Sequence, residues 1–212
     1  MARSLILWLI WASFIIYLLF FAPPIAADTV KLSLSINPVI VSLFSLVGIW
    51  LLIYSCLIFP DGRMQSLPAW AFILAAIATG VVGLIPYLAL RQPNQSFVGE
   101  KGTWITVLDS QKTGVILTIS AVVLVGYALI WGDWTGFVQE FLTNRFVHGM
   151  SLAFLLFCVL FPYPTLLQDD MARRGLIAES QLFQVVAWIP LLGALGYLCL
   201  RPPLLMSHSN KF

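Results

Sequence analysis

The sequence predicts an all-α membrane protein, a polytopic bundle of about six transmembrane helices, and three observations support this fold class. The 212 residues are 60% hydrophobic and only 9% charged, whereas soluble domains carry about 25% charged residues. The mean hydropathy is +0.96. Several apolar runs are about 20 residues long, enough for a helix to cross a hydrocarbon layer of about 30 Å. Backbone groups in that layer must pair within the chain, so we expect these runs to be helical.

The apolar runs place the helices of this single membrane domain, residues 1–212, at residues 5–22, 38–59, 69–90, 113–131, 146–161 and 182–200. The first run is longer than the 7–15 apolar residues of a signal peptide, so we expect a retained helix, with cleavage after it as the alternative. The second and third runs are separated only by a short polar turn. They therefore predict two spanning helices joined by a tight loop.

Small residues at helical spacing predict contact faces on two of these helices. In the third run they are Ala71, Ala75, Ala76, Thr79, Gly80 and Gly83, and in the sixth run they are Gly193 and Gly196. Small side chains let two helix backbones approach closely, which is how helices gain packing energy in lipid. The sequence leaves open whether each partner helix belongs to this chain or to another subunit.

The polar segments predict one further helix and two irregular stretches. Residues 136–144 place apolar side chains on one side and polar ones on the other, as in a short amphipathic helix at the membrane interface. Residues 91–112 contain two glycines and a proline and predict an exposed irregular loop. Residues 204–212 are expected to form a flexible tail.

The orientation in the membrane stays open with six helices. Cytoplasmic loops carry an excess of lysine and arginine. The side of the termini would hold five such residues (Arg3, Arg63, Arg145, Arg201 and Lys211), and the other side six (Lys31, Arg91, Lys101, Lys112, Arg173 and Arg174). Five against six is no bias.

Charged residues in the loops are candidates for contacts with lipid headgroups or partner subunits. Asp61 and Arg63 lie in the turn after the second helix, and Arg91 follows the third. The alternative for the turn is structural, because Asp and Gly favour turns and an arginine side chain can extend to a lipid phosphate.

A second charged group, residues 168–175, places Asp169 four residues before Arg173 and Asp170 four before Arg174. This order stabilises a helix, and the following glycine suits its C-terminal cap. Adjacent carboxylates can hold Mg²⁺ and paired arginines a phosphate, but the second acidic motif of membrane transferases is missing. A self-paired surface helix is the favoured interpretation, ahead of a docking patch and an active site.

His148 is the one histidine in an apolar run, and it could hold a pigment or make an ordinary hydrogen bond. Chlorophyll, carotenoid or lipid are the cofactors that such a protein could carry. The cysteines Cys56, Cys158 and Cys199 share no metal-ligand spacing and predict core residues. The net charge of +2 is scattered, which argues against nucleic acid. We predict no catalytic and no metal-binding residues.

Several runs of unusual residues carry a resemblance to known proteins: NPVIVSLFSLVGIWLLIYSCLIFPDGR, LPAWAFILAA, LIPYLALRQPN, RFVHGMSLAFLLFCVLFPYPTLLQDDMARRG and LLGALGYLCLRPPL. From Asn37 onward the chain resembles a family of uncharacterised multi-pass proteins of cyanobacteria and plant chloroplasts. The resemblance implies a photosynthetic membrane, such as the thylakoid, and it transfers no activity and no catalytic residue.

The sequence therefore predicts a non-catalytic assembly, stabilising or auxiliary factor for a larger photosynthetic membrane complex, in contact with lipids and other membrane subunits. The alternative is a small membrane enzyme for a carotenoid, quinone or lipid, which requires Asp169, Asp170, Arg173 and His148 to converge. The topology predicts that His148 and Asp169 lie on opposite sides. A transporter is third, because no predicted helix carries a charge at its centre.

Overall fold

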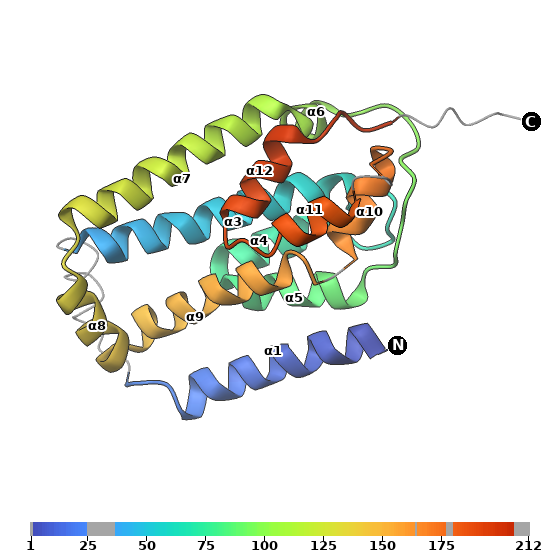
Figure 1. Ribbon diagram of the computed structural model, residues 1–212. Coiled ribbons are helices and arrows are strands. Elements are labelled where there is room, and N and C mark those ends of the chain that lie inside the picture. Colours follow the sequence, from blue (N-terminus) through green and yellow to red (C-terminus); the bar gives the residue numbers. More distant parts are fainter. Residues whose placement is uncertain (1, 25–36, 164, 177–179, 206–212) are drawn as a thin grey trace, which may run out of the picture.

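The computed structural model describes residues 2–24, 37–163, 165–176 and 180–205, which form a bundle of eleven helices (Figure 1). The helices are α1 (Ala2–Phe20), α3 (Pro38–Gly62), α4 (Ala69–Thr79), α5 (Val81–Leu90), α6 (Thr103–Asp109), α7 (Gln111–Trp131), α8 (Trp134–Thr143), α9 (Arg145–Leu160), α10 (Leu166–Arg173), α11 (Ser180–Val186) and α12 (Leu192–Leu200).

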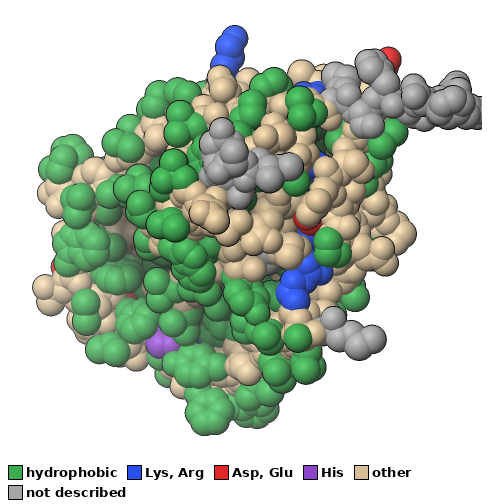
Figure 2. Space-filling model, turned by 45° about the vertical axis from the view of Figure 1, so that its right-hand side comes forward, with side chains coloured by type: hydrophobic (Ala, Val, Ile, Leu, Met, Phe, Trp, Pro, Cys, Tyr) green, Lys and Arg blue, Asp and Glu red, His purple; other side chains and the backbone are tan. Residues whose placement is uncertain are grey.

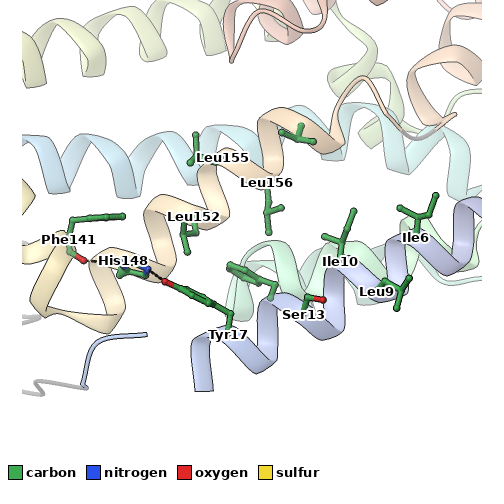
Figure 3. Close-up of a pocket in the computed structure, with 12 residues that line it drawn as sticks. Ile6, Leu9, Ile10, Ser13, Tyr17, Phe141, His148, Leu152, Leu155 and Leu156 are labelled. Atoms are coloured by element: carbon green, nitrogen blue, oxygen red, sulfur yellow. Dashed lines mark hydrogen bonds between the residues drawn. The ribbon is translucent and has the colours of Figure 1, made fainter. Parts of the chain in front are cut away.

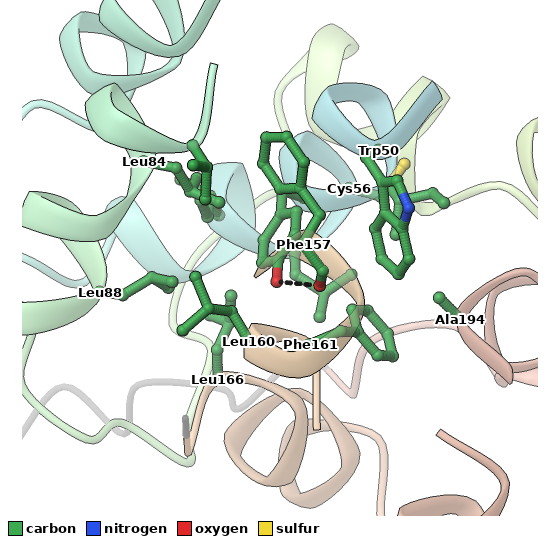
Figure 4. Close-up of a cluster of buried hydrophobic side chains, with 14 of the residues drawn as sticks. Trp50, Cys56, Leu84, Leu88, Phe157, Leu160, Phe161, Leu166 and Ala194 are labelled. Carbon is green, nitrogen blue, oxygen red and sulfur yellow. Dashed lines mark hydrogen bonds between the residues drawn. The ribbon is translucent and has the colours of Figure 1, made fainter. Parts of the chain in front are cut away.

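Helix α3 lies at the centre of the bundle and runs parallel to α9. Their aromatic side chains pack in register: Trp50 stacks on Phe157, and Tyr54 meets Phe161 edge to face (Figure 4). The buried Tyr54 hydroxyl donates to the Phe157 carbonyl at 3.1 Å. Buried aromatic side chains of this size dominate core energetics, so the α3–α9 pair is the framework on which the other helices pack.

The two ends of the bundle differ in chemistry. Helices α3 and α9 both begin at what we call the opposite end, where the side chains of Asn37 and Asn144 accept from the backbone N–H groups of Val39 and Phe146 and cap the helices. Helix α8 lies there as well. The other end, where α3 finishes at Asp61, gathers most of the charged side chains. We call it the charged end.

Residues 69–90 do not form the single spanning helix that the sequence predicts. The run is divided at Gly80, which adopts a left-handed φ of +64° and turns the chain back on itself. A Cβ on Gly83 would lie 2.4 Å from the Ala75 carbonyl carbon, so α5 packs backbone to backbone against α4. The predicted small-residue face is therefore used within the run. Both ends of this α4–α5 hairpin lie beside Gly62, because a Cβ there would meet Ala69 and the Tyr87 hydroxyl.

Residues 182–200 also form a hairpin of short helices in place of one predicted span. The chain reverses before α12, where Leu191 has a φ of 62°. A Cβ on Gly193 would lie 2.0 Å from the Val186 carbonyl oxygen, and Phe183 of α11 packs edge to face on Tyr197 of α12. Gly196, predicted to share this contact face, has no atom within 4 Å of a Cβ position. We call this pair the α11–α12 hairpin.

The structure supports three to four membrane crossings. Helices α1, α3 and α7 are long and apolar enough to span a bilayer, and α9 adds a fourth if it is counted together with α8, to which it is bent by 102°. Six spans are not shown, because two of the predicted spans are hairpins. The predicted loop 91–112 contains α6, and residues 204 and 205 of the predicted tail are bonded to Asp109 and Arg173. The predicted amphipathic helix is confirmed as α8.

With residues 69–90 and 182–200 folded as hairpins, the lysine and arginine side chains are divided unequally between the two ends of the bundle. Among the described residues, the charged end carries Arg3, Arg63, Arg91, Lys101, Lys112, Arg173, Arg174 and Arg201, and the opposite end carries Arg145. Eight cations against one is a strong bias under the positive-inside rule. We expect the charged end to face the cytoplasm or its organellar equivalent.

Cysteine labelling tests this orientation. In a variant with Cys199 replaced by Ala, single cysteines at the exposed positions Ser66 and Gln139 mark the charged and opposite ends. We expect a membrane-impermeant thiol reagent added from the cytoplasmic side to label Ser66→Cys and to leave Gln139→Cys unmodified until the membrane is opened. The reverse pattern would contradict the orientation.

The structure also uncovers an internal repeat that hydropathy alone does not reveal. The pattern Gly-x-x-x-Tyr-Leu-x-Leu-Arg-x-Pro occurs at residues 83–93 and again at 193–203. Each copy is the second arm of a hairpin, with its glycine against the first arm and its arginine at the charged end. Helices α3 and α9 correspond in the same way, as parallel helices capped by asparagine. Such parallel repeats are common in multi-pass membrane proteins.

Candidate functional sites: a buried charge network and an apolar cleft

The charged end holds a network of four carboxylates and four guanidinium groups with almost no exposure to solvent. Its members are Asp61, Arg91, Asp109, Asp169, Asp170, Arg173, Arg174 and Arg201. They come from five elements that are distant in sequence: the ends of α3, α5 and α12, together with α6 and α10. The buried members carry equal numbers of both signs, and the partly exposed Lys101 adds a fifth cation, 2.7 Å from Asp109.

The ion pairs form one continuous chain across the charged end. Arg91 bridges Asp61 at 2.6 Å and Asp169 at 2.5 Å. Arg173 then joins Asp61, at 2.9 Å, to Asp170, at 3.7 Å. The chain continues through Arg174, which contacts Asp170 at 2.8 Å and Asp109 at 2.6 Å. Buried charges are tolerated only when paired and hydrogen-bonded in this way.

The repeat reappears in the network as two similar sets of Asp, Tyr and Arg. In the first set, the Tyr87 hydroxyl donates to Asp61 at 2.7 Å, and Asp61 also accepts from Arg91. In the second, the Tyr197 hydroxyl donates to Asp170 at 2.6 Å, and Arg201 lies 3.5 Å from the same carboxylate. Each hairpin is thus tied to the network by the tyrosine and arginine of its second arm.

Ion pairing outweighs burial in setting the pKa of Asp170 and of Arg174. Burial alone would raise the pKa of the Asp170 carboxyl, but the guanidinium groups of Arg174, Arg201 and Arg173 outweigh it and hold that pKa well below its usual range. Burial would likewise lower the pKa of Arg174, yet Asp170 raises it above its usual value. The Asp170 carboxylate is therefore ionised and already engaged with cations.

Of the seven charged residues predicted to contact headgroups or partners, six lie inside this network, and only Arg63 is exposed. Arg63 donates to the Glu100 carbonyl and lies over the Phe97 ring. The predicted pair of Asp170 with Arg174 is formed, but Asp169 pairs with Arg91 in place of Arg173. The helix predicted on the surface is buried, so the six side chains are oriented toward one another and away from any partner.

The second candidate site is a cleft between α1 and α9 with a volume of about 760 Å³ (Figure 3). Its lining is mostly aliphatic, and no carboxylate or cysteine belongs to it. The twelve lining residues are Ile6, Leu9, Ile10, Ser13, Phe14, Tyr17, Phe141, His148, Leu152, Leu155, Leu156 and Val159. About half of the surface of Leu9, Leu155 and Val159 is exposed, so the cleft opens to the side of the bundle.

His148 forms the polar corner of this cleft. Its Nε2 lies 2.8 Å from the Tyr17 hydroxyl and its Nδ1 lies 2.9 Å from the Phe141 carbonyl. The imidazole stacks on the Phe141 ring, with 4.4 Å between the centroids, and its centroid lies 5.7 Å from that of the Tyr17 ring. Figure 2 shows histidine surrounded by hydrophobic side chains on this face. The predicted hydrogen-bonding role of His148 is present, and both ring nitrogens are occupied by it.

The residues that the enzyme hypothesis requires are not brought together. His148 lies in the first turn of α9 at the opposite end, whereas Asp169, Asp170 and Arg173 lie beyond the other end of that helix. From His148 to Leu160 the helix rises about 18 Å, so the two groups lie at opposite ends of α9. Among the described residues, no group of three or more His, Cys, Asp or Glu side chains is arranged to hold a metal ion.

Comparisons with models of known protein families, with curated proteins and with solved structures find no match to this chain.

Proposed function

We propose that this protein is a non-catalytic auxiliary protein of a photosynthetic membrane that holds a long apolar molecule in the cleft between α1 and α9. The cleft is the observation that carries the proposal. Its volume lies within the range of about 300–1,000 Å³ that is typical of ligand sites, and its apolar lining with a few polar groups at one end is the usual composition of such sites.

The internal repeat supports the proposal, because it indicates where a helix is displaced. In the second half, α7 packs against α12 and also lies along α3, where Gly132 approaches Val39. In the first half, α1 packs in the same way against α5. Helix α1 meets α9 through Tyr17, near the C-terminal end of α1, and the cleft separates the rest of α1 from α9. The cleft thus occupies the place of a packed helix interface.

The non-catalytic character of the proposal follows from the same geometry. The carboxylates of the charge network are paired with cations, and the imidazole at the cleft is hydrogen-bonded at both nitrogens. The proposal therefore assigns binding, and no reaction, to this chain. The photosynthetic membrane enters through the resemblance described above. An assembly factor is compatible with the proposal, but six of the seven charged residues predicted as its contacts are buried.

Obstruction of the cleft tests the proposal. Leu152 lies in the middle of the lining, and Leu152→Trp would fill part of the cleft (Figure 3). We expect the tagged wild-type protein, purified from its native membrane in mild detergent, to retain one class of lipophilic molecule. In Leu152→Trp the retained amount should fall by at least about tenfold, which corresponds to 1.4 kcal/mol of binding free energy. Mass spectrometry of the organic extract provides the measurement.

The matched control is Leu129→Trp, the same exchange at an exposed position of α7 that faces away from the cleft. It should retain the molecule at the wild-type level. Equal retention by Leu152→Trp and the wild type would overturn the proposal, as would a wild-type extract with the same composition as the bulk membrane lipid.

A further inference from the structure

The polar corner of the cleft carries an inference about the chemistry of its occupant, and this inference rests on the proposed function. The corner consists of Tyr17 and His148, with Ser13 one helical turn away from Tyr17 on α1 (Figure 3). These are the polar side chains in a lining that is otherwise aliphatic and aromatic. A ligand held there must match the hydrogen-bonding capacity that they leave unused.

The hydrogen bonds within this corner determine whether it offers a donor or an acceptor to a ligand. A carbonyl oxygen only accepts, so the Phe141 carbonyl requires a hydrogen on Nδ1 of His148. A neutral imidazole carries one such hydrogen, and Nε2 is then an acceptor that receives the hydrogen of the Tyr17 hydroxyl. The Tyr17 oxygen has donated its only hydrogen and retains acceptor capacity. The dyad therefore presents an acceptor, and no donor, to the cleft.

Ser13 is a separate polar group in the lining, and its hydroxyl can either donate or accept a hydrogen bond. Ser45, Ser55 and Ser151, which also lie within long apolar helices, each donate to the carbonyl four residues earlier. Within the described residues, Ser13 makes no such bond, although its side chain is exposed at the cleft near the middle of α1. Ser13 and Tyr17 lie one helical turn apart on α1, and the Tyr17 side chain extends from there toward His148 (Figure 3).

We propose that the occupant is a long apolar alcohol whose hydroxyl group donates to the Tyr17 oxygen. The aliphatic remainder would extend along α1 toward Ile6, about 16 Å from Tyr17 at the helical rise per residue. The hydroxyl group distinguishes this class from hydrocarbons, from ethers and from quinones, whose oxygens only accept.

A pair of probes that differ in one hydrogen-bond donor tests this proposal. The probes are tritiated geranylgeraniol and its methyl ether, measured for binding to the purified full-length protein in the same detergent. We expect the wild type to bind the alcohol about three- to tenfold more tightly than the ether, the ratio that corresponds to one hydrogen bond. The double variant Tyr17→Phe/His148→Leu removes the acceptors of the dyad to which the inference assigns the alcohol, and it should bind the two probes equally.

The outcomes separate this inference from the proposed function. If the wild type binds both probes equally and Leu152→Trp loses both, the cleft is a lipophile site, but the inference of an alcohol is wrong. Tighter binding of the ether would also overturn it. If the wild type binds neither probe, both proposals fail. Retention of the ether by the double variant shows that the variant is folded, so a loss of selectivity there is a loss of the polar contact.

Discussion

Replacement of Asp61 by alanine is expected to destabilise the protein strongly. The carboxylate has no exposed surface and accepts from Tyr87, Arg91 and Arg173. Its loss leaves two buried guanidinium groups without their shared anion. Removal of one partner from a buried ion pair typically costs about 3–5 kcal/mol, because an uncompensated charge remains. The measurement is the midpoint temperature of unfolding in one fixed detergent.

Two control variants are compared with Asp61→Ala. Glu100→Ala removes an exposed carboxylate from the same end of the bundle and should leave the midpoint nearly unchanged. Asp61→Asn retains the shape and one acceptor oxygen but not the charge. Its decrease in midpoint temperature should therefore lie between those of Asp61→Ala and Glu100→Ala. If Asp61→Ala were no more harmful than Glu100→Ala, the network would not hold the α4–α5 hairpin in place.

The fold class could be predicted from hydropathy, but the number of spans could not. Residues 69–90 are apolar throughout, and a window of hydropathy responds equally to one long helix and to two short helices folded together. The difference lies at Gly80, where a left-handed φ reverses the chain, and at Gly83, which permits backbone contact. Both glycines were predicted as contact residues. That their partner lies within the same run is a tertiary property.

The charged site was predicted in part for a similar reason. The residues of the network could be recognised as unusual in so apolar a chain, and the pair of Asp170 with Arg174 follows from local helical spacing. The partners of Asp169 and Arg173 come from α5 and α3, so helical spacing within α10 could not predict these two pairs. Arg201 and Asp109, which complete the network, were not singled out at all.

One signal in the sequence could have located Arg201 in advance. It ends the second copy of the pattern that places Arg91 after Tyr87, 110 positions earlier. A search for internal repeats would have matched the two copies and given Arg201 and Tyr197 the same role as Arg91 and Tyr87. No comparable sequence pattern indicates the cleft, because it results from the different packing of α1 and α7 in the two halves.

The second large effect is expected at Gly114, where α7 crosses α12. A Cβ at this position would lie 2.7 Å from both the carbonyl carbon and the oxygen of Leu198, and 2.9 Å from the backbone nitrogen of Cys199. These are backbone atoms, so no side-chain rotation relieves the clash, and the helices must separate. Overpacking of this kind costs about 1–3 kcal/mol. We expect Gly114→Ala to lower the midpoint of unfolding markedly.

Gly126→Ala on the same helix is the matched control. A Cβ there has no atom within 4 Å, and alanine is favoured over glycine in a helix by about 1 kcal/mol, so this variant should be neutral or slightly stabilised.

Cys199 offers a second readout, because it is partly buried at this contact, 3.3 Å from the Thr118 hydroxyl. Separation of α7 from α12 should increase its rate of modification by a thiol reagent. An unchanged midpoint and labelling rate in Gly114→Ala would show that α7 does not anchor the α11–α12 hairpin. The correspondence of α7 with α1, on which the origin of the cleft is argued, would then fail as well.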